Sequence, residues 1–255
     1  MRLHSSQGSV AKPGRFRRGA PKMAGVTFED VTAKLASLAS PRNAEGMAGY
    51  GIRPRTRVLG ISIYDLHKIA REIGRDHRLA QRLWRSKIHE ARILASYIEE
   101  PEKVTPRQLD AWVRGFDSWD IVDQVSELIA RTPFAREKIH EWAGRDEEFV
   151  RRAAFALIAE IAWHHKTTPD KDFEQFFPVI KKAATDDRNF VKKAVNWALR
   201  NIGKRSPALN RRATRVAREI QAIDSKSARW IAADALRELT SPSIQRRLRR
   251  RRPRR

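Results

Sequence analysis

The stretch Asp146-Glu147-Glu148-Phe149-Val150-Arg151-Arg152-Ala153-Ala154 is echoed 41 residues later by Asp187-Arg188-Asn189-Phe190-Val191-Lys192-Lys193-Ala194-Val195. Each stretch runs from an acidic residue through a Phe-Val pair and two basic residues to alanine. A fainter echo joins Ala198-Leu199-Arg200 to Ala235-Leu236-Arg237, 37 residues later. A repeat of about 40 residues is typical of arrays in which each helix pair buries its apolar face against its neighbours.

Outward from this repeat, apolar residues recur at helical spacing along almost the whole chain, and no stretch alternates with the period of two typical of strands. The pattern therefore predicts an all-α protein. Pro41 is expected to end the first helix, before a loop that runs through Gly46, Gly49, Gly51 and Pro54. The expected helices cover residues 27–39, 63–73, 77–84, 88–98, 106–115, 119–131, 134–144, 147–164, 170–185, 189–203, 208–223 and 225–239.

The expected architecture is a HEAT-like repeat α-solenoid of stacked antiparallel helix pairs over residues 26–240. The inner helices of such a solenoid line a concave groove, which we expect to be basic and to hold DNA; a protein-binding scaffold is the commoner use of the architecture. Residues 1–25 and the Arg-rich residues 241–255 are expected to be disordered. Met23 is an alternative to Met1 as the start of translation.

The chain has 53 Lys and Arg against 30 Asp and Glu, a net charge of +23. Six basic residues lie in 1–25 and eight in 241–255, where no acidic residue occurs, so the folded part keeps an excess of about +9. The charge of the tails has two alternative explanations: the tails serve only to raise solubility, or a GC-rich genome increases the arginine content. The basic folded part beside them favours a nucleic acid as the partner.

Several classes of function are excluded by the residues that the chain lacks. It contains no Cys, which rules out disulfides and thiolate chemistry, and no run of 18 apolar residues, so we expect no membrane span. No P-loop, dinucleotide-binding glycine motif or nucleophile elbow occurs. His164 and His165 are adjacent and point to different helix faces, so we expect no metal site. We also expect that the protein needs no cofactor. We expect it to be a bacterial cytoplasmic protein that associates with the nucleoid while it acts.

The sequence Phe116-Asp117-Ser118-Trp119-Asp120-Ile121-Val122-Asp123 leads into one amphipathic helix, for which Ser118 can serve as the N-cap. Trp119 and Asp123 are spaced i and i+4, which places them on one helix face. A large aromatic plane beside a carboxylate could receive a cationic substrate. A half-buried tryptophan next to a solvated or capping aspartate would give the same spacing, so both interpretations stay open at this point.

Seven tryptophans are many for this length. Trp119 and Trp197 each have a charged residue four positions away, Asp123 and Lys193 respectively. Arg152 occupies the repeat position of Lys193, so we expect both to face the same groove. The other five tryptophans stand among apolar residues and are expected in the core; they are Trp84, Trp112, Trp142, Trp163 and Trp230.

Over roughly residues 27–240, the chain resembles the AlkD-type DNA alkylation repair glycosylases, a family built from HEAT repeats. The similarity is carried by Ser118-Trp119-Asp120-Ile121-Val122-Asp123, Phe149-Val150-Arg151-Arg152-Ala153-Ala154 and Lys193-Ala194-Val195-Asn196-Trp197-Ala198-Leu199-Arg200. Met47-Ala48-Gly49-Tyr50 and Leu59-Gly60-Ile61 resemble the family as well.

The resemblance implies that Asp123 is the catalytic carboxylate. It further implies that Trp119 and Trp197 are the groove tryptophans and that Arg152 is the groove arginine. All four residue types are retained at the matching positions. We also expect Lys193, the repeat counterpart of Arg152, to contact DNA.

Tyr50, in the similar N-terminal stretch, is a further expected DNA contact. Two positions depart from the family pattern. The family's tandem tryptophan is Ser118-Trp119 here, and the loop Arg53-Pro54-Arg55-Thr56-Arg57 is more basic and less aromatic. The loop bears on substrate range and on DNA binding, but not on the catalytic carboxylate.

The resemblance therefore predicts a monomeric, monofunctional DNA glycosylase of base excision repair, acting on double-stranded DNA that contains N7- or N3-alkylated purines. Such purines are cationic and leave readily, so the enzyme needs a carboxylate near C1′ more than a strong acid. The alternatives are a non-catalytic DNA-binding or damage-sensing member of the family and a HEAT scaffold for an acidic protein. The retention of Asp123 with both tryptophans favours the enzyme.

Overall fold

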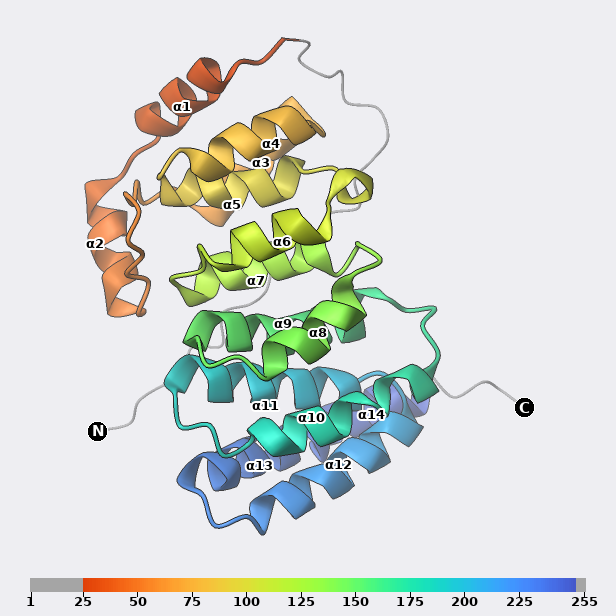
Figure 1. Ribbon diagram of the computed structural model, residues 1–255. Coiled ribbons are helices and arrows are strands. Elements are labelled where there is room, and N and C mark those ends of the chain that lie inside the picture. The colour runs from red at the N-terminus through yellow and green to blue at the C-terminus, as the bar shows by residue number, and fades with distance from the viewer. Residues whose placement is uncertain (1–24, 251–255) are drawn as a thin grey trace.

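The computed structural model describes residues 25–250, in which there are fourteen α-helices, two short 3-10 helices and no β-strand (Figure 1). The all-α class is therefore confirmed; the predictions of disorder for residues 1–24 and 251–255 lie outside the described residues. The elements are α1 (Phe28–Ser37), α2 (Pro41–Gly49), α3 (Ile63–Ile73), α4 (His77–Arg85), α5 (His89–Ile98), η1 (Pro101–Lys103), α6 (Pro106–Val113), α7 (Trp119–Ile129), α8 (Ala135–Ala143), α9 (Glu148–His164), η2 (Asp170–Phe173), α10 (Phe176–Ala183), α11 (Asn189–Gly203), α12 (Pro207–Gln221), α13 (Lys226–Leu239) and α14 (Pro242–Arg250).

Helix pairs stack along the molecule, from α1 at one end to α12 and α13 at the other (Figure 1). The helices α5, α7, α9, α11 and α13 form one layer, here called the odd layer, in which each helix packs on the next. The helices α4, α8, α10 and α12 pack against members of this layer. This arrangement is that of a HEAT-like repeat solenoid, which confirms the predicted architecture. Within the described range, no helix is long and apolar enough to cross a bilayer.

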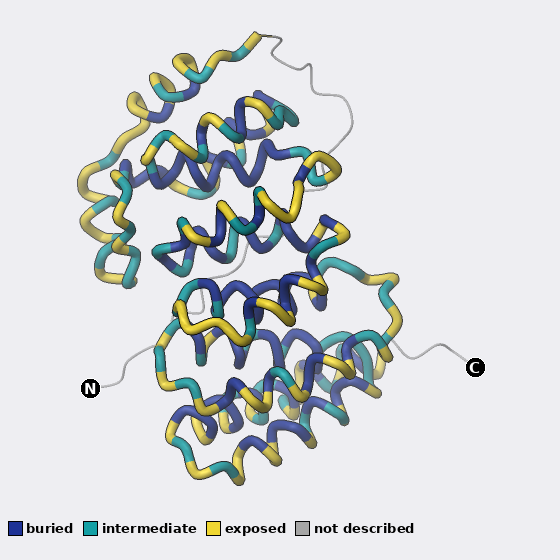
Figure 2. Tube along the Cα trace, viewed as in Figure 1, coloured by how far each residue is buried: buried dark blue, intermediate teal, exposed yellow. Residues whose placement is uncertain are grey.

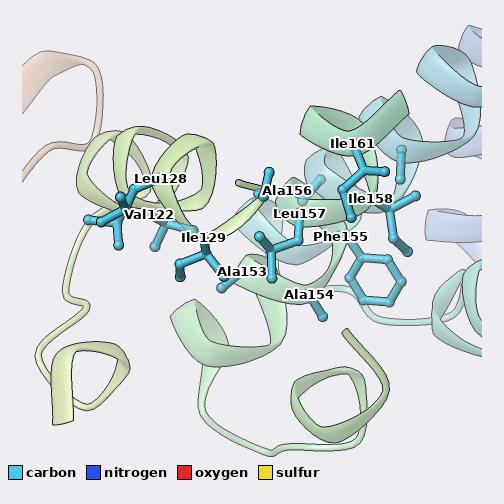
Figure 3. Close-up of a cluster of buried hydrophobic side chains, with 14 of the residues drawn as sticks. Val122, Leu128, Ile129, Ala153, Ala154, Phe155, Ala156, Leu157, Ile158 and Ile161 are labelled. Carbon is cyan, nitrogen blue, oxygen red and sulfur yellow. The ribbon is translucent and has the colours of Figure 1, made fainter. Parts of the chain in front are cut away.

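The two repeated stretches form the turns before α9 and α11 and the first turns of these helices, which pack on each other. Nearly every residue of α9 from Val150 to Ala162 is buried, because α7, α8 and α11 all cover it (Figure 2). Figure 3 shows part of the resulting core, where Val122 and Ile129 of α7 lie in one cluster with Leu157 of α9. The odd layer is therefore a rigid platform for the side chains that it presents.

Pro41 opens a helix and does not end one. The hydroxyl of Ser40 accepts a hydrogen bond from the backbone N–H of Asn43, and Pro41 takes the first helical position, where a missing N–H costs little. The prediction of a loop is therefore wrong for α2. The helix escapes detection because none of its residues is buried, so it has no apolar periodicity, and because Gly46 and Gly49 disfavour helix.

The Arg-rich segment is helical from Pro242 to Arg250. Ile244 and Leu248 of α14 are spaced i and i+4 and are both buried. The side-chain amide of Gln245 donates to the carbonyl of Leu239 at 2.6 Å and to Oδ1 of Asn210 at 3.0 Å. The prediction of disorder from residue 241 is therefore wrong as far as residue 250, because two apolar side chains among the arginines are enough to dock one helix face.

The tryptophans that are buried in the core are not all those that were predicted to be. Trp112 and Trp142 are fully buried, and Trp84 stacks on Trp112 with ring centroids 4.2 Å apart. Trp163 and Trp230 are 40% and 41% exposed, so the prediction that they belong to the core is wrong. Their apolar neighbours in sequence lie on other faces of α9 and α13, which is why composition around them is misleading.

Candidate functional site

Asp123 projects from the first half of α7 and is held by Arg152 of α9. Arg152 Nη2 donates to both carboxylate oxygens at 2.8 Å, and its Nε donates to Oδ1 at 3.1 Å. The remaining nitrogen, Nη1, donates to the carbonyl of Phe190 in the first turn of α11 at 2.8 Å. Arg152 therefore connects three successive helices of the odd layer.

The Asp123 side chain keeps 19% of its surface exposed, whereas that of Arg152 keeps 6%. Burial raises the pKa of Asp123 to about 6, and the positive charge of Arg152 opposes that rise. At neutral pH the carboxylate is mostly ionised. An ionised carboxylate has about four acceptor positions, and Arg152 fills three, so Asp123 can still accept a hydrogen bond from a water molecule.

Trp119, one turn before Asp123, is fixed by the segment that follows α2. The indole Nε1 donates to the carbonyl of Tyr50 at 3.0 Å, while the Tyr50 side chain is largely exposed. Gly51 has a φ of +79°, and a Cβ there would lie 2.9 Å from Cζ of Phe190, so this close approach requires glycine. The end of α2 thus lies against the starts of both α7 and α11.

The start of α7 is fixed by a buried polar cluster that the sequence did not reveal. His89 Nε2 of α5 lies 2.6 Å from Oδ2 of Asp120, and the hydroxyl of Ser118 donates to Oδ1 of Asp120 at 2.5 Å. Ser118 occupies the N-cap position but makes no side-chain capping hydrogen bond, because its hydroxyl is used by Asp120. Burial raises the pKa of Asp120, but the hydrogen bonds from His89 and Ser118 outweigh it, so the pKa is lowered and the carboxyl is ionised.

The structure brings only some of the predicted residues into contact. Asp123 and Arg152 form an ion pair, and Trp119 contacts the Tyr50 backbone. Trp197 is partly buried against the core on α11, and Lys193, one turn earlier, is exposed. Within residues 25–250, no hydrogen bond or ion pair joins either of these two to Asp123.

The repeat equivalence of Arg152 and Lys193 does not extend to their environments. The guanidinium of Arg152 is buried and engaged with protein acceptors, whereas the ammonium of Lys193 faces solvent. In this structure Arg152 therefore positions the carboxylate of Asp123. Its predicted contact with DNA, like those of Lys193, Trp197 and Tyr50, stays a prediction.

Glu160 is a further acidic residue that sequence analysis missed. It is buried on α9 with its carboxylate 3.0 Å from Nε2 of His164. Burial raises the pKa of Glu160, whose charge in turn contributes to the raised pKa of Asp123. Its position eight residues after Arg152, which returns to the same helix face, is the signal that could have identified it. In the described part of the chain, no group of three His, Asp or Glu side chains could hold a metal ion.

The chain is similar to known proteins both in sequence and in fold. A family model described as DNA alkylation repair enzyme matches residues 31–239. An uncharacterized protein of Listeria innocua is 20% identical over 199 residues, which cover 76% of this chain and 87% of that protein. A solved structure reported as a new family of proteins related to the HEAT-like repeat DNA glycosylases, with affinity for branched DNA structures, is similar with a TM-score of 0.70. Its sequence identity is 17%, and the match covers 84% of this chain and 95% of the other, so this similarity is one of fold.

Proposed function

Since the chain belongs to the family of DNA alkylation repair enzymes, we propose that it binds duplex DNA and hydrolyses the N-glycosidic bond of purines made cationic by alkylation at N7 or N3. The observation that carries this proposal is the ionised carboxylate of Asp123, which Arg152 fixes one turn after an aromatic side chain. The basic folded part of the chain supports a polyanionic substrate.

The chemistry requires a negative charge beside the sugar. As the bond between C1′ and the purine nitrogen breaks, its electron pair neutralises the cationic base, and positive charge grows on the sugar. A fixed carboxylate stabilises that charge, and a water oxygen then bonds to C1′ and loses a proton. Asp123 is suited to the first role by its charge and to orienting the water by its remaining acceptor position.

The neighbouring groups fit the same reaction. Arg152 keeps the carboxylate in one orientation, so no reorganisation is needed when charge develops on the sugar. The face of an indole attracts a cationic nucleotide over a neutral one, which is the role proposed for Trp119 and Trp197. The hydrogen bond from Trp119 Nε1 to the Tyr50 carbonyl fixes the plane of the first indole.

The purified protein is expected to release 7-methylguanine from methylated duplex DNA. The free base is measured chromatographically under excess enzyme, and spontaneous release from the same DNA without protein is subtracted. Release above this background supports the proposal. Tight binding of methylated duplex without release would instead identify a non-catalytic DNA-binding protein.

The second candidate function is DNA binding without catalysis, and it is favoured by the ion pair between Arg152 and Asp123. Arg152 offsets the charge of Asp123 and fills three of its acceptor positions, which weakens the carboxylate as a catalytic group. The structurally similar protein is described by its affinity for branched DNA. The release assay separates the two candidates directly.

The rate of excision is expected to fall as the pH is lowered through about 6. The pKa of Asp123 is raised by burial to about 6, and only the ionised form stabilises positive charge, so activity is retained above this pKa and lost below it. Single-turnover rates between about pH 5 and pH 8 should decline about tenfold for each unit below the pKa. A rate that is flat or rises on acidification would contradict the proposed role of Asp123.

A further inference from the structure

A shallow, open pocket of about 370 Å³, here called the cavity, lies at the side of the molecule where α5 and α7 begin. Its walls are the segment after α2, the turn between α4 and α5, and the turn between α6 and α7. Four cationic side chains and one carboxylate line it. The lining residues are Arg55, Thr56, Trp84, Arg85, Lys87, Arg92, Gly115 and Asp117.

The back of the cavity is built around Arg92. Its guanidinium lies over the ring of Trp84 at 4.5 Å, and Trp84 in turn stacks on the buried Trp112. It donates to the carbonyl of Gly115 and lies 3.5 Å from Oδ1 of Asp117. A Cβ at residue 115 would be 2.7 Å from Nη2 of Arg92, so glycine is what admits the guanidinium. Arg92 is therefore a fixed, buried cation.

The single carboxylate of the cavity is already satisfied. Asp117 accepts hydrogen bonds from Arg92 and from the backbone N–H of Arg55, the latter at 2.9 Å. The exposed Arg55 side chain lies 3.8 Å from the same carboxylate. Within the described residues, Arg85 and Lys87 have no carboxylate within 4 Å. The cavity consequently carries a surplus of positive charge.

The turn that carries Lys87 is held in one conformation. Lys87 has a φ of 60°, the left-handed region that non-glycine residues seldom adopt. The carbonyl of Lys87 accepts from the N–H of Arg57 at 3.0 Å, and the carbonyl of Arg57 accepts from the N–H of His89 at 2.8 Å. These bonds tie the turn to the segment after α2 and keep its cations at the cavity mouth.

Three other turns or helix starts of the solenoid pair a cation with a nearby carboxylate. Before α9, Arg145 pairs with Glu147 within its own turn. Before α11, Arg188 pairs with Asp186 at 2.6 Å, and Arg229 in the first turn of α13 pairs with Asp224 of the preceding turn at 2.9 Å. The cavity differs from these three turns because Arg85 and Lys87, with no carboxylate within 4 Å among the described residues, lie beside the buried Arg92.

We propose that this cavity binds one phosphate group of the DNA backbone. Arginine forks suit a phosphate, because they present several N–H donors together with positive charge. The cavity adjoins the candidate site, since Asp117 is two residues before Trp119 and the segment from Tyr50 to Arg55 contacts both. The proposal rests on the duplex binding of the proposed function and not on excision.

The test is the affinity for undamaged duplex of the double variant Arg85→Gln/Lys87→Asn. Asparagine adopts the left-handed conformation more readily than lysine, so the turn should be retained. The matched control, Arg211→Gln/Arg218→Gln, removes two exposed cations from α12. We expect the cavity variant to bind roughly tenfold more weakly than the control at moderate salt, with a salt slope shallower by about 1. Equal losses in the two variants would overturn the proposal.

Two further measurements identify the ligand and distinguish a failure of this proposal from a failure of the proposed function. If inorganic phosphate binds at the cavity while the cavity variant binds duplex as tightly as the control, the ligand is a small phosphate and the proposal fails. If the parent protein excises no base but the cavity variant still loses duplex affinity, the glycosylase function fails and the phosphate site stands. Circular dichroism of both variants confirms that each is folded.

Discussion

Replacing Asp123 by asparagine is expected to lower the single-turnover rate of 7-methylguanine release by about 10²–10³. The amide keeps the shape of the side chain but has no charge to place beside the sugar as the glycosidic bond breaks. Duplex affinity should not fall, because the carboxylate that is removed repels the DNA phosphates and does not attract them. The measurement is base release under saturating enzyme, with affinity determined separately on the same methylated duplex.

The control for this substitution must be an acidic residue without structural function. Asp120, three residues away, is unsuitable, because it is buried against His89 and Ser118 and its replacement would disturb the start of α7. Asp187→Asn removes the same charge from an exposed turn and should leave the rate unchanged. If Asp123→Asn releases base as fast as Asp187→Asn, Asp123 is not the catalytic carboxylate.

The fold could be predicted where helices bury one face. Each odd-layer helix has apolar residues at helical spacing, and the limits expected for α11, residues 189–203, are those observed. Apolar periodicity does not reveal α2, which buries no side chain, or α14, whose two buried apolar residues stand within an arginine run. Periodicity detects a helix through its contacts, so helices with few contacts are missed.

The candidate site could be predicted only in part. Spacing placed Trp119 and Asp123 on one face of α7, but nothing local shows that Arg152, 29 residues later, points back to this carboxylate. The same limit applies to His89, which is 31 residues before its partner Asp120. Such pairs depend on how neighbouring helices are set against each other, which the repeat period alone does not define. Lys193, equivalent to Arg152 by sequence repeat, remains solvent-exposed.

Replacing Arg152 by methionine is expected to lower the free energy of unfolding by about 3–5 kcal/mol, because it leaves a buried carboxylate uncompensated. The carbonyl of Phe190 also loses its donor, so the contact between α9 and α11 is weakened as well. Equilibrium denaturation in urea measures the loss. The matched control is Lys193→Met, which removes an exposed cation at the repeat-equivalent position and should change stability by no more than about 0.5 kcal/mol.

The double variant Arg152→Met/Asp123→Asn separates the ion pair from simple packing. A neutral amide does not need a cation, so the double variant should regain much of the stability lost by Arg152→Met alone. Without Arg152, the effect of burial on Asp123 is unopposed and its pKa should rise further. Excision by Arg152→Met should therefore recover toward higher pH, in contrast to Asp123→Asn. If Arg152→Met costs no more stability than Lys193→Met and leaves the pH profile unchanged, Arg152 does not position the carboxylate.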